Sequence, residues 1–439
     1  MIKKKSGGIF FGWWTVLAGG FLALWGWGYY LSGMSALFKP IASELGLSRA
    51  VTSVATGIGR FGGGVEAPIA GWVTDKFGPR WVITFGAFLA GLGLVIMYFI
   101  QSVWAYYIAW GVILGTGTNL SLTLPQDKAI TNWFVKKRGL AQGIRGIFTG
   151  LAPVVGLPIV TWLIVTQGWR MSCLVGGIVM WVVGVPLAWF LIKQQRPEYY
   201  GLLPDGAVAR EETAKDVDGM IGRGVAYATE VEEVEFTLRQ AVRTPTYWLF
   251  TVAYTAQGLS IPVVITHIIP LLTDMGVDPV KAAMMVSIAN AISIPMRFFG
   301  GFIADHVNKS NLRLLLAGAF FIQCAGVAAF VMRPTLVMAY PFLILFYLGL
   351  GASIPLSATL RARYFGRKAF GSIGGLSMML GTPFAVVSPI YAGWIFDTTG
   401  SYLTAFTTFA ICLGVAAVTM TFALAPKPPA QVTDIRKIM

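Results

Sequence analysis

Twelve runs of apolar residues constrain this chain more than any other feature of its sequence. Most are about twenty residues long or longer, which is the length that a helix needs to cross the hydrocarbon of a bilayer. Inside hydrocarbon every backbone amide must find its partner within its own segment, and strands of about ten alternating residues, as in a barrel, are not seen. The runs cover about 13–40, 50–74, 81–101, 103–132, 137–165, 170–193, 246–273, 280–304, 312–332, 336–363, 368–396 and 401–425. We therefore predict an all-α membrane protein with twelve transmembrane helices.

Composition agrees with a chain that folds in lipid. Of its 439 residues, 56% are hydrophobic and 12% charged, whereas soluble proteins carry about 25% charged residues. The three cysteines lie inside apolar runs, and with two histidines the chain shows no metal-ligand spacing, nucleophile elbow or phosphate loop. We therefore expect no enzyme activity, no cofactor and no bound metal.

The basic residues predict how the chain is oriented. The net charge of +14 is carried by loop clusters between the apolar runs, which favours a role in topology over binding of nucleic acid. If the amino terminus is cytoplasmic, the outside holds mainly Lys39, Arg49, Arg170, Lys281 and Arg333. The inside then holds Lys3, Lys4, Lys5, Lys76, Arg80, Lys136, Lys137, Arg138, Lys309, Arg313, Arg361, Arg363, Arg367 and Lys368. We expect a multi-pass protein of the cell inner membrane with both termini cytoplasmic, surrounded by lipid and without an obligate protein partner.

An internal repeat divides the chain into two halves. The motif Gly71-Trp-Val-Thr-Asp75-Lys-Phe-Gly-Pro-Arg80 has a weaker copy, Gly301-Phe-Ile-Ala-Asp305-His306, and the difference between 305 and 75 is 230. The same spacing relates Glu44-Leu-Gly46 to Asp274-Met-Gly276. We predict two pseudo-symmetric six-helix bundles, residues 1–193 and 246–439, joined by a cytoplasmic central loop at 194–245.

The central loop holds most of the acidic residues, including Glu211, Glu212, Asp216, Glu230, Glu232, Glu233 and Glu235. Its middle, around 219–229, lacks a clear apolar face and is expected to be mobile. Residues 236–242 place their apolar side chains on one side of a helix, which predicts an interfacial helix.

These motifs resemble the major facilitator superfamily. Trp133-Phe-Val-Lys-Lys-Arg138-Gly-Leu-Ala-Gln-Gly143 and Arg196-Pro-Glu-Tyr-Tyr-Gly-Leu-Leu-Pro-Asp205-Gly are similar to the branch of monocarboxylate transporters and oxalate/formate antiporters. The resemblance implies two bundles about a central cavity that opens alternately to either side.

The resemblance also implies a gate, in which Asp75 accepts hydrogen bonds from a helix amino terminus and Arg80 or Arg138 pairs across the loop. The copy at Asp305 lacks the later glycine and arginine, which weakens its expected part in the gate. The alternative for Lys76 and Arg80 is a purely topological role.

Ionisable residues inside apolar runs are the candidates for substrate chemistry, because such residues usually face a cavity. The resemblance implies that Arg297 binds the substrate carboxylate, and a guanidinium can do so with two charge-assisted hydrogen bonds. The alternative is a structural ion pair. Related sequences often carry an acidic or amide residue one turn earlier, where Ser293 stands here. Proton coupling would then pass to Glu66, whose alternative is a permanent salt bridge with Arg60 or Arg145.

Further polar residues complete the candidate site. Arg60 and Arg145 are possible second anion ligands, with surface anchoring as their alternative. Asn119 and Tyr391 are candidate donors to a substrate oxygen, and His267 is a second candidate for proton coupling. Asp127 and Lys128 are expected to pair with each other or with loop charges. The eleventh run lacks the lysine of oxalate-type relatives, which disfavours oxalate.

The function that we predict is proton-coupled symport of a small monocarboxylate such as lactate or pyruvate by alternating access. One alternative is an exchanger for a dicarboxylate, a sulfonate or a larger acid. An alternative of another class is a membrane sensor that binds such an anion and signals through its central loop.

Overall fold

A computed structural model describes residues 9–207, 217–229 and 234–428 of the chain, and these residues form helices and connecting turns without strands. Lys3, Lys4 and Lys5 lie outside the described residues, as do Glu211, Glu212, Asp216, Glu230, Glu232 and Glu233. The first half comprises α1 (Phe11–Trp27), η1 (Gly28–Gly33), α2 (Met34–Glu44), α3 (Arg49–Phe77), α4 (Pro79–Phe99), α5 (Val103–Tyr106), η2 (Tyr107–Leu114), α6 (Gly115–Leu122), α7 (Leu124–Trp133), α8 (Arg138–Leu151), η3 (Ala152–Gly156), α9 (Leu157–Val179), η4 (Met180–Gly184) and α10 (Val185–Leu191). The second half comprises α13 (Pro245–Asp274), α14 (Pro279–His306), η7 (Lys309–Asn311), α15 (Leu312–Met332), α16 (Leu336–Phe365), α17 (Phe370–Thr399) and α18 (Leu403–Phe422).

These helices follow the twelve predicted runs. In the described residues, eight segments are long and apolar enough to cross a membrane by length and composition alone. One of them, Arg138–Leu191, holds two predicted runs, because Gly168 adopts a φ of 83° and turns the chain inside it. The first and fourth runs are interrupted by the π-helical segments η1 and η2, and α3 carries the charges of Arg60, Glu66 and Asp75. The fold is the predicted one, an all-α membrane protein of twelve spans in two bundles.

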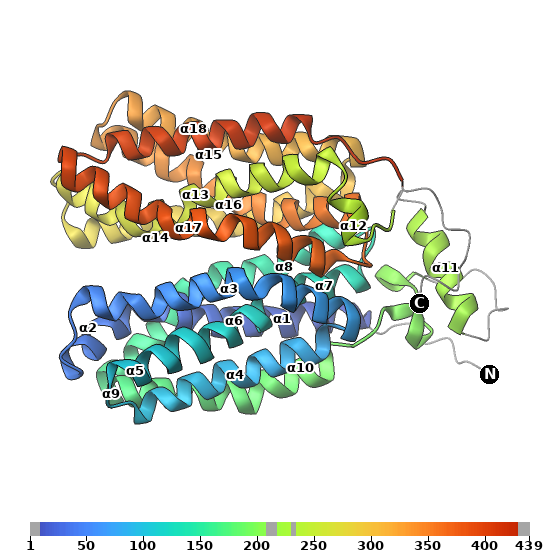
Figure 1. Ribbon diagram of the computed structural model, residues 1–439, viewed down its shortest axis with the longest axis horizontal. Helices are drawn as coiled ribbons and strands as arrows, with labels where there is room; N and C mark the ends of the chain where they lie inside the picture. The colour runs from blue at the N-terminus through green and yellow to red at the C-terminus, as the bar shows by residue number, and fades with distance from the viewer. Residues whose placement is uncertain (1–8, 208–216, 230–233, 429–439) are drawn as a thin grey trace.

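The two bundles lie side by side (Figure 1). Helices α1 to α10 form the N-terminal bundle, and α13 to α18 form the C-terminal bundle. The connecting segment with α11 (Val217–Thr229) and α12 (Leu238–Ala241) lies at one end of the molecule. We call this end the loop end, and it includes the loops at 134–137, 194–207 and 366–369.

The repeat is visible in the turns at the opposite end. Gly46 and Gly276, which are 230 residues apart, both adopt a left-handed conformation, with φ of 65° and 84°. Ser48 and Asp278 then cap α3 and α14 by accepting hydrogen bonds from backbone amides of the first turn. The same turn and cap therefore start the second helix of each half.

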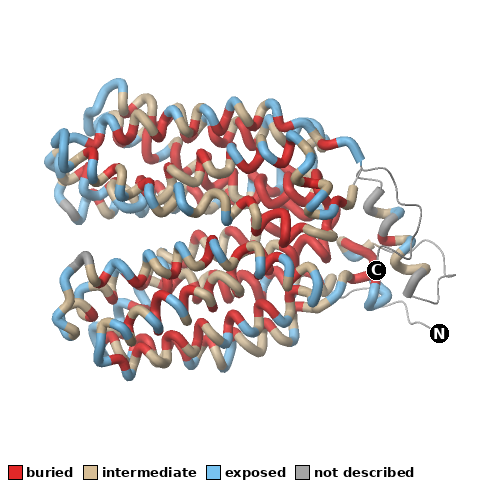
Figure 2. The backbone as a smooth tube through the Cα atoms, in the orientation of Figure 1, coloured by how far each residue is buried: buried red, intermediate tan, exposed pale blue. Residues whose placement is uncertain are grey.

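The bundles contact each other toward the loop end, where Figure 2 shows buried backbone continuing from one bundle into the other. Glycines make this contact possible. A methyl group on Gly71 of α3 would overlap the backbone of Gly371 of α17, and one on Gly301 of α14 would overlap Gly139 of α8. Small residues let two helix backbones approach closely, so these pairs define two equivalent crossings between the bundles.

The central segment is more ordered than predicted. The stretch at 219–229, which we expected to be mobile, lies within α11, where the hydroxyl of Tyr227 donates to Asp205 at 3.2 Å. The expected helix at 236–242 is short: α12 begins after a capping box formed by Thr237 and Gln240. Phe236 is buried against Phe365 of the C-terminal bundle, so this segment packs on protein as well as facing outward.

Replacing Gly301 with leucine is expected to keep the bundles apart at the loop end, because the new side chain would occupy the space of the Gly139 backbone. Spin labels on the exposed residues Lys137 and Ser310, one in each half, should report a longer distance than in the parent protein. Gly318→Ala is the control, since a methyl group there meets nothing within 4 Å. An unchanged distance in Gly301→Leu would show that this crossing does not hold the loop end closed.

Candidate functional site

Asp75, at the end of α3, binds the amino terminus of α17 in the opposite bundle. Its carboxylate accepts hydrogen bonds from the backbone amides of Gly371 and Ser372, at 3.1 and 2.7 Å, and from the Ser372 hydroxyl at 2.7 Å. The first amides of a helix have no partner inside the helix, and the helix dipole favours an anion there. This geometry is the one that the motif predicts for Asp75, and the gating role stays a prediction.

Asp305 makes the equivalent contact in the other direction. Its carboxylate accepts from the amides of Gly139 and Leu140, at 2.6 and 2.8 Å, at the amino terminus of α8. The sequence predicted a weaker second gate because the motif copy lacks the later glycine and arginine. The contact needs the carboxylate of Asp305 and a close approach to the start of α8, which Gly139 allows.

The two arginines predicted to pair across the loop lie in different surroundings. The guanidinium of Arg80 lies 4.0 Å from the ring centre of Trp189, within the N-terminal bundle. Arg138 is buried and donates from Nε to the carbonyl of Phe134 at 3.0 Å, within electrostatic reach of Asp305. Arg138 therefore lies at the second crossing, whereas Arg80 packs on an aromatic face.

Lys128 of α7 is a further contact between the bundles, and the sequence did not single it out for this role. Its ammonium lies 2.7 Å from Asp75 Oδ1, and it also donates to the carbonyls of Arg367 and Lys368 in the C-terminal half. Arg367 in turn donates to Asn132 and to Glu198 of the central segment. The charge of Lys128 inside an apolar run was the available signal, because buried lysines are rare unless paired.

Arg297 of α14 lies in a groove that three glycines of α8 leave open. Its Nη1 donates to the carbonyl of Gly146 at 2.9 Å, its side chain packs near Gly146 and Gly150, and its backbone lies against Gly143. The residue is 6% exposed, and its Nε has no hydrogen-bond partner within the described residues. The structure pairs it with no carboxylate among those residues, so the alternative of a structural ion pair is not what the described part of the chain shows.

Arg145, one residue before Gly146, belongs to a network of the N-terminal bundle. Its Nη2 lies 2.6 Å from Asp127 Oδ1, and its Nη1 donates to Gln126 Oε1 at 3.0 Å. Asp127 and Lys128 were expected to pair with each other or with loop charges, and Lys128 has the second kind of partner, Asp75 of the loop motif. The two residues do not pair with each other, because successive side chains of a helix point about 100° apart. Asp127 faces α8 and Lys128 faces α3, and only Lys128 meets a residue of the loop motif.

Ser293 lies on α14 one turn before Arg297 and is buried. Its hydroxyl donates to the carbonyl of Asn290 at 2.6 Å within the same helix. A serine in this arrangement carries no charge to balance Arg297.

Glu66, Arg60 and Asn119 lie in the N-terminal bundle. Glu66 Oε1 accepts from the Thr116 hydroxyl at 2.6 Å, and its Oε2 is buried without a partner in the part of the chain that the structure describes. Both Arg60 and Glu66 are within electrostatic reach of the Tyr30 hydroxyl. Asn119 donates to the carbonyl of Gly59 at 3.2 Å. The structure thus pairs Arg145 with Asp127 and not with Glu66.

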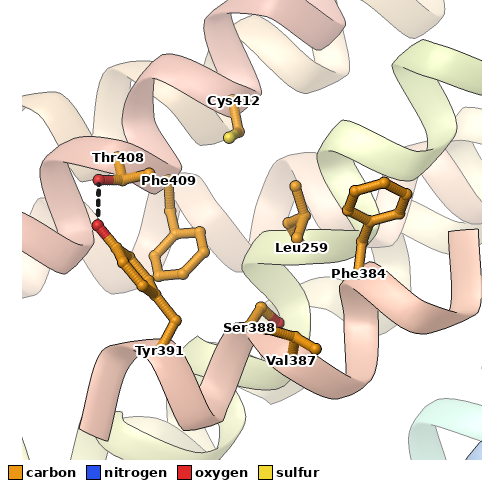
Figure 3. A pocket seen from close by; sticks show the side chains of 8 residues that line it. All are labelled: Leu259, Phe384, Val387, Ser388, Tyr391, Thr408, Phe409 and Cys412. Atoms are coloured by element: carbon orange, nitrogen blue, oxygen red, sulfur yellow. Dashed lines mark hydrogen bonds between the residues drawn. The ribbon is translucent and has the colours of Figure 1, made fainter. Parts of the chain in front are cut away.

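His267 and Tyr391 lie in the C-terminal bundle, and their contacts are within that bundle. His267 Nε2 lies 3.0 Å from the carbonyl of Pro389, and its Nδ1 lies 3.2 Å from the Tyr402 hydroxyl. A carbonyl only accepts, so Nε2 carries the hydrogen and the neutral ring is satisfied on both sides. Tyr391 points toward α18 and shares a hydrogen bond of 3.2 Å with Thr408, beside a largely apolar hollow (Figure 3). The hollow is lined by Leu259, Phe384, Val387, Ser388, Tyr391, Thr408, Phe409 and Cys412.

The structure therefore gathers the predicted residues into separate groups. Arg297, Ser293 and Arg145 lie at or beside the crossing of α8 and α14, and Asp75 and Asp305 close the loop end. Glu66, Arg60 and Asn119 form a group in the N-terminal bundle, and the contacts of His267 and Tyr391 place them inside the C-terminal bundle.

Two related bundles that close at one end over a buried guanidinium are the architecture of a secondary transporter. The chain matches the model of the Major Facilitator Superfamily over residues 16–389 and belongs to that family. It is 26% identical over 355 residues to monocarboxylate transporter 12-B of Danio rerio, and the aligned residues cover 77% of this chain and 72% of that protein. It is 27% identical to the probable sulfoacetate transporter SauU of Cupriavidus necator, over 81% of this chain and 80% of that one. The oxalate:formate antiporter of Oxalobacter formigenes is 24% identical over 64% of this chain and 60% of its own length. These relatives confirm the predicted branch.

A solved structure confirms the fold. The proton:xylose symporter XylE superposes with a TM-score of 0.72 over 93% of this chain and 95% of that one, at 13% identity. The protein is therefore a multi-pass membrane transporter, and members of this family are not enzymes.

Removing the negative charge of both capping residues, Asp75→Asn and Asp305→Asn, is expected to favour opening at the loop end. Hydrogen bonds to a charged group contribute about 1.5–3 kcal/mol each. Losing even part of that free energy shifts the equilibrium between the closed and the open loop end by roughly tenfold or more. The spin-label distance between Lys137 and Ser310 should lengthen in the double variant.

Glu44→Gln is the matched control, because Glu44 pairs with Arg170 at the end away from the loops and within one bundle. It removes a carboxylate without touching either crossing. If the control lengthens the distance as much as the double variant does, the two caps are not what holds the loop end closed.

Proposed function

We propose that the protein is a secondary active transporter of small organic anions, with monocarboxylates such as lactate or pyruvate as the favoured substrates. The observation that carries this proposal is the position of Arg297, buried at the crossing of α8 and α14 without a carboxylate partner in the described residues. A buried cation is costly unless it is paired, so an anionic ligand supplies what the described protein groups do not.

The fold gives Arg297 access to a substrate when the bundles move. Arg297 belongs to the C-terminal bundle, and the carbonyl that it binds belongs to Gly146 of the N-terminal bundle. Rocking of one bundle on the other breaks this single contact and frees a second face of the guanidinium. A planar guanidinium then binds a carboxylate through two charge-assisted hydrogen bonds. The anionic group of the substrate then takes the place of the Gly146 carbonyl as the partner of Arg297.

We propose that the loop end faces the cytoplasm. The predicted inside cluster of basic residues lies largely at this end, and Lys39 and Arg170 lie at the opposite one. In that orientation the structure is closed toward the cytoplasm by Asp75, Asp305 and Lys128. Opening toward the cytoplasm then requires these contacts to separate together.

Proton coupling, if it operates, is assigned to Glu66 in preference to His267. One oxygen of Glu66 is buried without a hydrogen-bond partner in the described residues, and its other oxygen accepts from the Thr116 hydroxyl. Both ring nitrogens of His267, in contrast, have hydrogen-bond partners within the C-terminal bundle.

The second candidate is exchange of a larger acid, such as a sulfonate or a dicarboxylate. Ser293 supports it, because an uncharged residue beside Arg297 leaves more positive charge for the substrate to balance. The similarity to a probable sulfoacetate transporter and to an oxalate:formate antiporter is consistent with this class. Oxalate itself stays disfavoured by the absence of a lysine in the Gly374–Pro383 stretch.

Arg297→Ala is expected to abolish uptake of labelled lactate, or of sulfoacetate, into proteoliposomes that contain the purified protein. Losing a charge-assisted pair with a buried guanidinium costs about 3 kcal/mol or more, which corresponds to at least a hundredfold loss. Arg333→Ala, which removes an exposed arginine at the opposite end, should transport like the parent. Uptake of neither anion by correctly folded parent protein would sink the proposal, and binding without flux would favour a sensor.

Glu66→Gln separates symport from exchange. If Glu66 carries the proton, the variant is expected to lose uptake driven by an inward proton gradient while it keeps the exchange of internal for external anion. Gradient-driven uptake that survives at the parent rate would exclude Glu66 as the proton carrier. Thr116→Val is the control, because it removes only the hydroxyl that donates to Glu66 at 2.6 Å.

A further inference from the structure

Arg361 of α16 is a buried cation for which neither the gate nor the Arg297 site gives a role. It is 4% exposed, and both its Nε and its Nη1 are buried without a hydrogen-bond partner in the described residues. The sequence predicted a surface position for it because it lies near the basic loop cluster. Its guanidinium lies instead 5.6 Å from the ring centre of Phe250 and 5.3 Å from that of Phe370.

Aromatic faces attract a guanidinium, but they satisfy none of its N–H groups. A buried cation whose donors are unmet is destabilising, and replacing it with an apolar residue would remove that cost. Arg361 belongs to no ion pair among the residues that the structure describes. An arginine in this position is therefore poorly explained by the stability of the closed state alone.

Arg361 lies where the two bundles meet. A methyl group on Gly374 of α17 would lie 2.6 Å from Arg361 Nη1 and 2.7 Å from Leu124 Cδ2, so the arginine and this leucine of the opposite bundle flank the same point. Leu124 leaves this point when the N-terminal bundle moves away at the loop end. That movement uncovers the unpartnered N–H groups of Arg361.

The position of Arg361 along α16 places it on the loop-end side of Arg297. Gly300, three residues after Arg297, packs against Ala352, and Arg361 follows Ala352 by nine residues. At 1.5 Å per residue this corresponds to about 14 Å along the helix toward the loop end. An anion that leaves Arg297 toward the loop end therefore approaches Arg361.

Three arginines near the interface, Arg145, Arg297 and Arg361, outnumber the carboxylates with which they pair in the described residues. Arg145 is within electrostatic reach of Arg297, and Tyr254 is within reach of both Arg361 and Asp127. Within the described part of the chain, the only ion pair that these three arginines form is that of Arg145 with Asp127. Two of the three guanidiniums thus keep an uncompensated positive charge.

We propose that Arg361 is a second anion-binding residue, which receives the carboxylate or sulfonate group of the transported anion after the bundles separate at the loop end. This inference rests on the proposed function and adds a step to it, a transfer of the anionic group from Arg297 to Arg361. In the closed state Leu124, Phe250 and Phe370 cover the site, so it binds only in the state that is open at the loop end.

The test compares anion affinity in two states of the protein. The double variant Asp75→Asn, Asp305→Asn supplies the loop-open state, and the melting temperature is measured against rising concentrations of inorganic sulfate, lactate and sulfoacetate. A ligand that binds the folded state raises the melting temperature, and the dependence of that rise on the ligand concentration gives the apparent Kd. Adding Arg361→Gln to this double variant is expected to raise the apparent Kd about tenfold or more. In the parent background the same substitution should change the Kd by less than about twofold.

Arg363→Gln is the matched control, because Arg363 lies on the same helix and donates to the carbonyls of Ala304 and Val307 in its own bundle. It should leave the Kd unchanged in both backgrounds. Arg361→Lys keeps the charge without the planar fork, so it is expected to give an intermediate Kd, and it replaces the glutamine variant if that variant fails to fold.

Equal Kd values with and without Arg361→Gln in the loop-open background would overturn the inference, and so would the absence of stabilisation by all three anions. An Arg361-dependent affinity for sulfate in a protein that transports neither lactate nor sulfoacetate would keep the anion site and reject the proposed substrates. Transport by the parent together with an unaltered Kd in the variant would reject the site and keep the proposed function.

Discussion

At the loop end two carboxylates each cap a helix of the opposite bundle. Asp75 reaches the first amides of α17, and Asp305 reaches those of α8. A side chain as short as aspartate makes such bonds only if the two helices nearly touch. Glycines at 71, 139, 301 and 371 are therefore needed at the same crossings, because any Cβ there would hold the backbones apart. Charge and close approach act together at both crossings.

The remaining contacts at the loop end depend on this approach. Lys128 meets both Asp75 and the carbonyls of 367 and 368 only while the first crossing is closed. The buried pair of Arg367 with Glu198 then ties the central segment to the C-terminal half. Such contacts form or break as a group, since each lies against the others. An interface whose contacts separate together suits the alternating access that we propose.

The sequence predicted the parts of this structure that depend on local pattern. Apolar run length and the 230-residue repeat were enough for the twelve helices, and the turn at Gly46 and Gly276 follows from the same repeat. A charge inside an apolar run was enough to select Arg297. Pairings between distant segments were not predictable in this way: Asp127 meets Arg145, and Lys128 meets Asp75, because of the angles at which α3, α7 and α8 pack. The burial of Arg361 likewise follows from packing, since its neighbours in sequence resemble a basic loop.

The balance of charge at the interface links substrate to movement. An acidic residue at position 293 would neutralise Arg297 from within its own helix, and the protein could then close without any ligand at little electrostatic cost. With Ser293 in that place, the positive charge of Arg297 must be balanced from outside the helix. In the mechanism that we propose, an anion binds Arg297 once the bundles separate and the carbonyl of Gly146 no longer holds the guanidinium. A ligand shifts an equilibrium only toward the state that it binds more tightly, so the loaded protein would leave the closed state more readily than the empty one, in which opening takes from Arg297 its one carbonyl partner.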